Sequence, residues 1–160
     1  MGQGFGNRAV TAILRSPLHG LLGQGFALME FTGRRSGRAY TVPVNAFAAE
    51  DGYLIISRRE RTWWRNLRDR PDAALRHRGS VRQMQAQVVA DPREVAEILR
   101  LHLRQRPSHS RSFGIAIGQD GEPNAKQLER AAQERVLIRL RPGRSAPAQQ
   151  LPPLPLLLSS

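Results

Sequence analysis

Cysteine is absent from this chain of 160 residues, and its absence removes several kinds of chemistry at once. Disulfides, thiolate nucleophiles and cysteine-based zinc or iron–sulfur centres are all excluded. The four histidines show no metal-ligand spacing, so no metal site is expected and we treat them as structural or exposed: His19, His77, His102 and His109. The sequence contains no recognisable catalytic triad or carboxylate pair, so it identifies no catalytic residue.

Long apolar runs are also missing. No stretch approaches the roughly 20 apolar residues that are needed to span a bilayer, so no membrane span is expected. The first six residues, MGQGFG, lack the apolar core of a signal peptide. The sequence therefore predicts a soluble, cytoplasmic protein.

Lysine is nearly absent although the chain is strongly basic. Of the 25 basic residues 24 are arginine, Lys126 is the exception, and the formal net charge is +12. A GC-rich coding sequence would give this ratio whatever the function, so many of the arginines are expected to be solvated. Such a surface speeds the arrival of an anionic ligand. The basic surface is also compatible with non-specific nucleic-acid binding. Such binding would weaken steeply as the salt concentration rises. The chain contains no motif that reads bases in a groove.

The most informative segment is a glycine-bracketed basic turn at residues 32–38, with the sequence TGRRSGR, between two apolar runs. Its glycines permit a tight turn and close backbone approach. Exposed amides beside fixed positive charge suit a phosphate or a carboxylate. A second polar and aromatic element follows at Ser57-Arg58 and at residues 63–67, WWRNL. Together the two elements indicate an anionic cofactor with an aromatic ring system.

Hydrophobic patterning predicts six short strands, at residues 26–31, 40–48, 53–57, 73–78, 81–89 and 136–140. Pro43 implies an edge position or a bulge in the second strand. Asp51-Gly52 is a hairpin turn, and Gly79-Ser80 joins the fourth and fifth strands. In the fifth strand Met84, Ala86 and Val88 alternate with glutamines, which is typical of a half-buried strand.

Helices are predicted at four places. Residues 7–22 form a broken amphipathic helix, and residues 62–68 form a short one with Thr62 as its cap. A third helix begins at Asp91-Pro92 with a capping aspartate and an N1 proline, and its inner face carries Val95, Ile98, Leu99 and His102. The fourth lies around Leu128.

These elements predict an α+β, mainly β fold: a small antiparallel barrel of about six strands with short flanking helices. Residues 1–141 have the length of one domain. Residues 142–160, rich in proline and leucine, are expected to form a disordered tail.

The ordered motifs resemble the deazaflavin-dependent nitroreductase family, a branch of the flavin-binding split β-barrel proteins. The matching segments are residues 32–37 with Thr41 and Pro43, residues 51–58, and residues 63–67 with Pro71. The resemblance implies a split β-barrel oxidoreductase in which a reduced 8-hydroxy-5-deazaflavin (coenzyme F-420) passes a hydride to a small organic acceptor, a quinone or a nitro compound. The protein would supply mainly orientation and electrostatics.

The resemblance also implies which residues hold the coenzyme. Its phosphate and acidic glutamyl tail would be held by Arg34, Arg35, Ser36 and Gly37. Its tricyclic ring would lie in a slot lined by Thr41, Pro43, Ile56, Ser57 and Arg58. Two residues of the short helix would close this slot, Trp63 and Asn66, while Trp64 is expected in the core. Local backbone hydrogen bonding is the other reading for Asn66.

Three departures from the family pattern keep alternatives open. Ala39-Tyr40 stands where relatives carry Pro-Arg, residues 59–61 replace a longer glycine-containing loop, and the last third of the chain has no tyrosine. The alternatives are the same barrel using FMN, and a non-catalytic barrel that only sequesters the coenzyme or another ligand. Split barrels often pair with the site near the interface, so the resemblance is also compatible with a homodimer.

Overall fold

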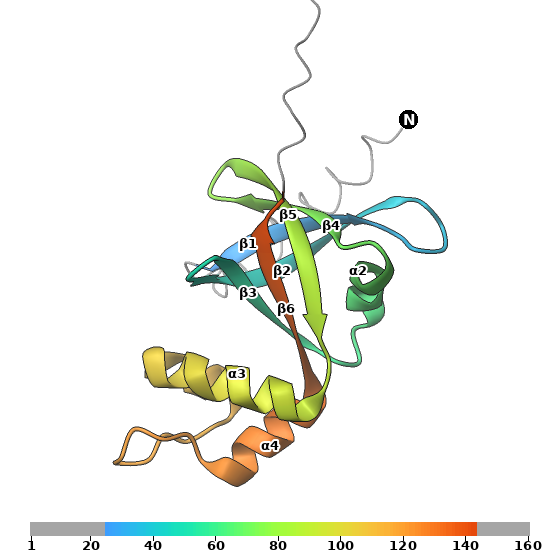
Figure 1. Ribbon diagram of the computed structural model, residues 1–160. Coiled ribbons are helices and arrows are strands. Elements are labelled where there is room, and N and C mark those ends of the chain that lie inside the picture. Colours follow the sequence, from blue (N-terminus) through green and yellow to red (C-terminus); the bar gives the residue numbers. More distant parts are fainter. Residues whose placement is uncertain (1–24, 144–160) are drawn as a thin grey trace, which may run out of the picture.

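The computed structural model describes residues 25–143 and shows a closed six-stranded barrel (Figure 1). Its strands are β1 (Phe26–Thr32), β2 (Ala39–Ala49), β3 (Gly52–Arg58), β4 (Asp72–His77), β5 (Ser80–Val89) and β6 (Arg135–Pro142). The order around the barrel is β1-β2-β3-β6-β5-β4, and every pairing is antiparallel. The predicted mainly β barrel is therefore confirmed. The helix predicted over 7–22, His19 and nearly all of the tail predicted over 142–160 lie outside the described residues.

Alternating side chains fill the barrel, as the period of two in a strand requires. Met84 and Ala86 are 3% and 8% exposed, whereas the glutamines that alternate with them, Gln83, Gln85 and Gln87, face solvent. Two turns differ from the prediction by one residue. The β2–β3 turn is Glu50-Asp51, and Gly52 already belongs to β3, where it pairs with Ala49. The β4–β5 turn is Arg78-Gly79, with φ of 49° and 79°, and Ser80 already belongs to β5. Two left-handed residues suit the twist of a two-residue hairpin.

The β2 strand changes partners along its length. Residues 39–45 pair with β1, and only Ala46–Ala49 pair with β3. Pro43 therefore lies opposite Leu28 of β1 with no β3 residue on its other side, which confirms the predicted edge position. Because β2 and β3 separate before Ala46, the barrel is split along this seam.

Helices cover one end and one flank of the barrel. The α3 (Pro92–Gln105) and α4 (Ala125–Glu134) helices pack together at one end, joined through the 3-10 helix η3 (Pro107–Phe113), which the sequence did not predict (Figure 1). Asp91 caps α3 as expected, accepting hydrogen bonds from the backbone N–H groups of Arg93 and Glu94 at 3.0 and 3.1 Å. None of the helices within residues 25–143 has the length and apolarity needed to cross a bilayer.

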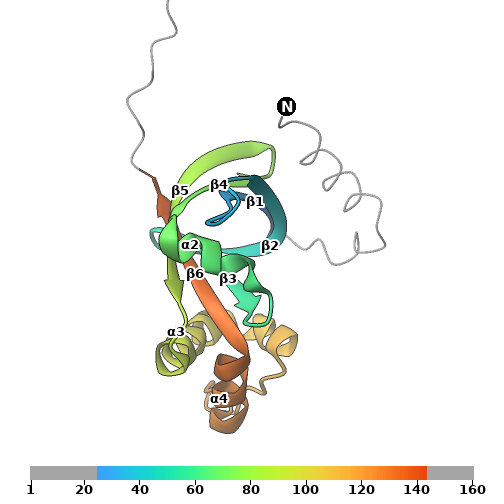
Figure 2. The same cartoon turned by 90° about the vertical axis from the view of Figure 1, so that its right-hand side faces the viewer.

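A short helical segment crosses the flank of the barrel, as Figure 2 shows for its second part. It consists of η2 (Thr62–Arg65) and α2 (Asn66–Asp69). Trp64 and Leu67 anchor it in the barrel core, with exposures of 3% and 1%, as expected for Trp64. The predicted cap is wrong: Arg61 is the N-cap residue, with no side-chain cap bond, and Thr62 is already inside the turn.

Candidate functional site

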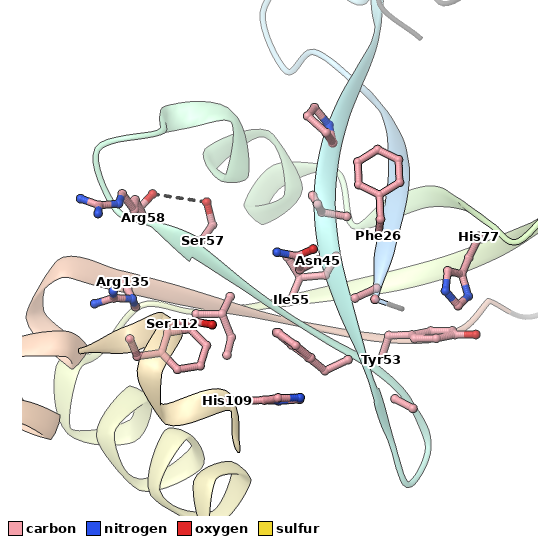
Figure 3. Close-up of a pocket in the computed structure, with 18 of the residues that line it drawn as sticks. Phe26, Asn45, Tyr53, Ile55, Ser57, Arg58, His77, His109, Ser112 and Arg135 are labelled. Carbon is pink, nitrogen blue, oxygen red and sulfur yellow. Dashed lines mark hydrogen bonds between the residues drawn. The ribbon is translucent and has the colours of Figure 1, made fainter. Parts of the chain in front are cut away.

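A cavity of about 910 Å³ opens at the seam between β2 and β3 (Figure 3). The edges of both strands are unpaired there, so backbone and side chains from each strand reach the opening. The volume lies at the upper end of the range for small-molecule and cofactor sites, roughly 300–1,000 Å³. The seam therefore has room for a tricyclic ring and a second small molecule beside it.

Most of the residues assigned to the ring slot line this cavity: Pro43, Ile56, Ser57, Arg58 and Trp63. Ser57 is buried, and its hydroxyl donates to the Arg58 carbonyl at 3.3 Å. Thr41 does not line the cavity, but it precedes Pro43 by two residues and so lies on the same face of β2. The five residues that line the cavity come from three separate elements, β2, β3 and η2, which meet at the seam.

The basic turn forms the tip of the β1–β2 hairpin and does not line the cavity. None of the four residues predicted there, Arg34, Arg35, Ser36 and Gly37, borders the cavity itself. Gly37 has a φ of 66°, so the left-handed conformation that favours glycine occurs there. The Ser36 hydroxyl accepts from the Arg38 N–H at 3.3 Å and lies 3.1 Å from the Tyr40 hydroxyl.

Asn66 ties this hairpin tip to the cavity wall. Its Oδ1 accepts the backbone N–H of Arg34 at 2.9 Å, and its Nδ2 donates to the Trp63 carbonyl at 2.8 Å. The Arg34 guanidinium also meets Asp69 at 3.4 Å. The structure thus gives Asn66 a role within the protein, and it places the basic turn beside the segment that carries Trp63.

An aromatic row reinforces the same connection. Phe31 stacks between Tyr40 and Trp63, with ring centroids 5.9 and 5.8 Å away. The Tyr40 hydroxyl also lies 3.1 Å from the Ser36 hydroxyl. Tyr40 therefore connects the hairpin tip to Trp63 through Phe31.

Arginine dominates the charge of the cavity. Five arginines line it and no aspartate or glutamate does: Arg58, Arg61, Arg78, Arg106 and Arg135. Arg58 meets Glu60 only at 3.9 Å. Arg135 lies mostly buried, and burial lowers the pKa of its guanidinium while Glu134, at 3.6 Å, opposes that shift. Such a concave positive surface attracts an anion.

Sequence reasoning missed much of this lining. Arg61, Arg106 and Arg135 come from a loop, the end of α3 and the start of β6, and His109 comes from the unpredicted η3. Nothing in the local sequence marks these residues as part of a site. Positive charge alone could not identify the three arginines, because the chain has 24 arginines.

Two histidines form a hydrogen-bonded pair at the cavity. His102 Nε2 and His109 Nδ1 lie 3.0 Å apart, and both rings pack against Phe47. Burial, then His109 and Arg106, lower the pKa of His102 from 6.5 to about 4, and burial also lowers the pKa of His109. His102 is buried as expected for a structural residue, whereas His109 borders the cavity. Within residues 25–143 no cluster of histidine and acidic side chains could hold a metal ion.

Comparison with known proteins gives a family and a fold. The model of a family described as "F420H(2)-dependent quinone reductase" matches residues 10–114. Curated protein sequences give no match. An FMN-binding, pyridoxamine 5'-phosphate oxidase-related protein from Nostoc punctiforme aligns with a TM-score of 0.50 at 12% identity, covering 87% of this chain and 81% of that one. This likeness supports the fold alone.

Two further solved structures are similar at lower TM-scores. One is titled "F420 Reductase", with 18% identity, a TM-score of 0.44, and 75% of this chain and 87% of that one covered. The other is an "F420-H2 Dependent Reductase", with 16% identity, a TM-score of 0.42, and coverages of 72% and 93%.

Proposed function

Because the chain belongs to the F420H(2)-dependent quinone reductase family, we propose that its arginine-lined cavity holds the ring of the deazaflavin coenzyme and that a quinone is the acceptor. The protein is accordingly a deazaflavin-dependent oxidoreductase. One observation supports the assignment of the site: Pro43, Ile56, Ser57, Arg58 and Trp63, which the sequence predicted to surround the ring, border one cavity that is lined by five arginines and no carboxylate.

The ring would lie at the seam between Pro43 of β2 and the β3 residues Ile56, Ser57 and Arg58, with Trp63 beside it. Apolar surface and one indole suit a flat ring system, and the buried Ser57 offers its hydroxyl as one polar contact in this wall. The reduced coenzyme, when bound, supplies a hydride, and this chain binds and orients it and limits the access of water.

The acidic tail would run along the β2 face past Thr41 to the hairpin tip. Arg35 makes no hydrogen bond or ion pair within residues 25–143, so its guanidinium is available to an anion. Ser36 and Gly37 are exposed beside it, while Arg34 is fixed by Asn66 and Asp69. Micromolar affinity needs about 8 kcal/mol, and charge-assisted hydrogen bonds of about 1.5–3 kcal/mol each would supply a large share.

Equilibrium titration tests the site. The deazaflavin coenzyme is titrated by fluorescence quenching, with FMN in parallel, against wild type, Arg35→Ala, Ser36→Ala and Arg100→Ala. Arg100 is an exposed arginine of α3 outside the cavity, so its loss is a matched charge control. We expect Arg35→Ala to weaken coenzyme binding at least tenfold, which is about 1.4 kcal/mol, and Arg100→Ala to change it less than twofold.

Other results would contradict the proposal. Equal losses for Arg35→Ala and Arg100→Ala would show a diffuse charge effect, and tighter binding of FMN would assign a different cofactor. Binding without turnover of 2-methyl-1,4-naphthoquinone would point to sequestration, and faster turnover of a nitro compound would reassign the acceptor. A homodimer and a cytoplasmic location stay predictions from the sequence, and size-exclusion chromatography with light scattering tests the first.

A further inference from the structure

The cavity extends beyond the residues assigned to the coenzyme. Thr41, Pro43, Asn45 and Phe47 follow each other at alternate positions of β2 and so share a face. Phe47 follows Pro43 four positions later, so the two lie about 13 Å apart along a strand that rises about 3.3 Å per residue. The hairpin tip precedes Thr41, so the Phe47 end lies farthest from the tip. A coenzyme that runs from the tip to Pro43 would leave this far end open.

The far end carries polar groups of its own. Arg106, at the end of α3, lines the cavity, and its guanidinium reaches across to the Ala48 carbonyl at 3.5 Å. His109 lines it from η3, as Figure 3 shows, with its ring 4.8 Å from that of Phe47. His102 holds the Nδ1 atom of His109 at 3.0 Å, so Nε2 is the ring nitrogen left to a ligand. A flat apolar face and two cavity-lining nitrogen groups thus meet at one place.

We propose that His109 and Arg106 form the acceptor-binding end of the cavity, where His109 donates a hydrogen bond from Nε2 to a carbonyl oxygen of a quinone. This rests on the proposed function. When the His102 Nε2–H donates to His109 Nδ1, the proton of neutral His109 lies on Nε2. Burial lowers the pKa of both histidines, which favours neutral rings near pH 7, and in a neutral pair one ring nitrogen donates to the other. The groups facing His109 are His102 from α3, Arg106 directly after α3, and Phe47 from β2.

The donor would stabilise the charge that the reaction develops. Hydride transfer to one quinone oxygen would break the donor C–H bond of the reduced deazaflavin, which is oxidised by two electrons, and would form an O–H bond. The quinone π electrons shift into the ring, and the π pair of the opposite carbonyl moves onto its oxygen. The resulting hydroquinone anion then takes one proton from water. Positioned N–H donors stabilise such an oxyanion, and removing one commonly lowers kcat by about 100- to 1,000-fold. The exposed Arg106 adds positive charge beside the same oxygen.

Steady-state kinetics with 2-methyl-1,4-naphthoquinone and direct coenzyme titration test the proposal on His109→Ala, His109→Gln, Arg106→Gln and the control Arg100→Gln. We expect His109→Ala to lower kcat/KM for the quinone at least tenfold with coenzyme Kd changed less than twofold. His109→Gln should recover part of this loss because its amide still donates. Arg106→Gln should raise the quinone KM, and Arg100→Gln should leave it unchanged.

A second measurement does not need the coenzyme. In the ¹⁵N-labelled protein alone, 2-methyl-1,4-naphthoquinone should shift the imidazole signal of His109, which is assigned by its loss in His109→Gln. Absence of that shift at saturating quinone, an unchanged kcat/KM in His109→Ala, or an equal loss of coenzyme affinity would overturn the proposal. If wild type fails to bind the coenzyme, the proposed function fails, and the imidazole signal still decides whether His109 binds the quinone.

Discussion

Replacing Arg59 by alanine should destabilise the protein far more than the same change at its neighbour Arg58. The Arg59 guanidinium donates to three backbone carbonyls: to Ala90 at 2.7 Å, to Gln133 at 3.0 Å and to Arg135 at 3.1 Å. It therefore fastens the loop after β3 to the ends of β5, α4 and β6. The Arg59 carbonyl also accepts the Trp64 indole N–H at 3.1 Å. The Arg58 side chain, by contrast, is exposed, and within residues 25–143 it forms one ion pair, with Glu60 at 3.9 Å.

The size of the effect follows from these contacts. Hydrogen bonds with one charged partner contribute about 1.5–3 kcal/mol each, but water can reach part of this site and solvate the carbonyls once the side chain is gone. We therefore expect Arg59→Ala to lower the free energy of unfolding by about 2–3 kcal/mol, which is less than the sum over the three hydrogen bonds. In a domain of this size that lowers Tm by about 6–15 °C. A lone exposed ion pair contributes about 0–1 kcal/mol, so Arg58→Ala should shift Tm by at most a few degrees.

Urea unfolding of wild type, Arg59→Ala and Arg58→Ala, followed by tryptophan fluorescence, measures the free energies of unfolding, and thermal unfolding measures the Tm values. Arg59→Lys is a further variant, because one ammonium cannot reproduce the planar fork of donors, and it should recover less than half of the loss. Coenzyme titration should give the opposite order. Arg58→Ala should weaken coenzyme binding more than Arg59→Ala, because Arg58 lines the cavity and Arg59 does not. Equal unfolding midpoints for Arg58→Ala and Arg59→Ala would refute the reasoning.

Two further predictions concern the tip and the histidine pair. Asn66→Ala removes one hydrogen bond to the hairpin tip, at Arg34, and one to the Trp63 carbonyl. We therefore expect about 1–2 kcal/mol less stability in urea and weaker coenzyme binding by titration. Asn66→Asp, which keeps the acceptor for Arg34, should lose less stability. Stability should also fall between pH 6.5 and about 4, because in that window the unfolded state protonates His102 and the folded state does not. Screening by solvent reduces the expected loss of unfolding free energy to about 1–2 kcal/mol. Urea midpoints measured against pH test this, and they should depend less on pH in His102→Phe than in wild type.

The strands were predictable because their signals are local. Alternation in Met84 and Ala86 marked the buried face of β5, and Pro43 marked the unpaired edge of β2. The Arg78-Gly79 turn was misplaced by one residue because an arginine in the left-handed region is uncommon. The register of the strand pair, rather than any residue preference, sets that turn.

The site was predictable only in part, since it depends on contacts between distant segments. The motifs identified the wall formed by Ser57, Arg58 and Trp63, which lies close in sequence. They did not indicate the opposite wall, where Arg106 and His109 follow the α3 helix, which begins at Pro92. This wall forms only when α3 and η3 pack against the barrel. The local sequence around Arg106 and His109 does not indicate that packing.

The arginines show why composition could not assign their roles. Arg59 bonds to three carbonyls and acts as a structural brace, Arg135 is buried beside Phe113 at the cavity, and Arg35 meets no partner within the described residues. All three contribute one charge to the same formal total of +12. What separates them is how many acceptors and rings lie within reach of each guanidinium. A net charge therefore predicts attraction to anions, whereas the cavity at the β2–β3 seam determines which of these cations a bound anion can contact.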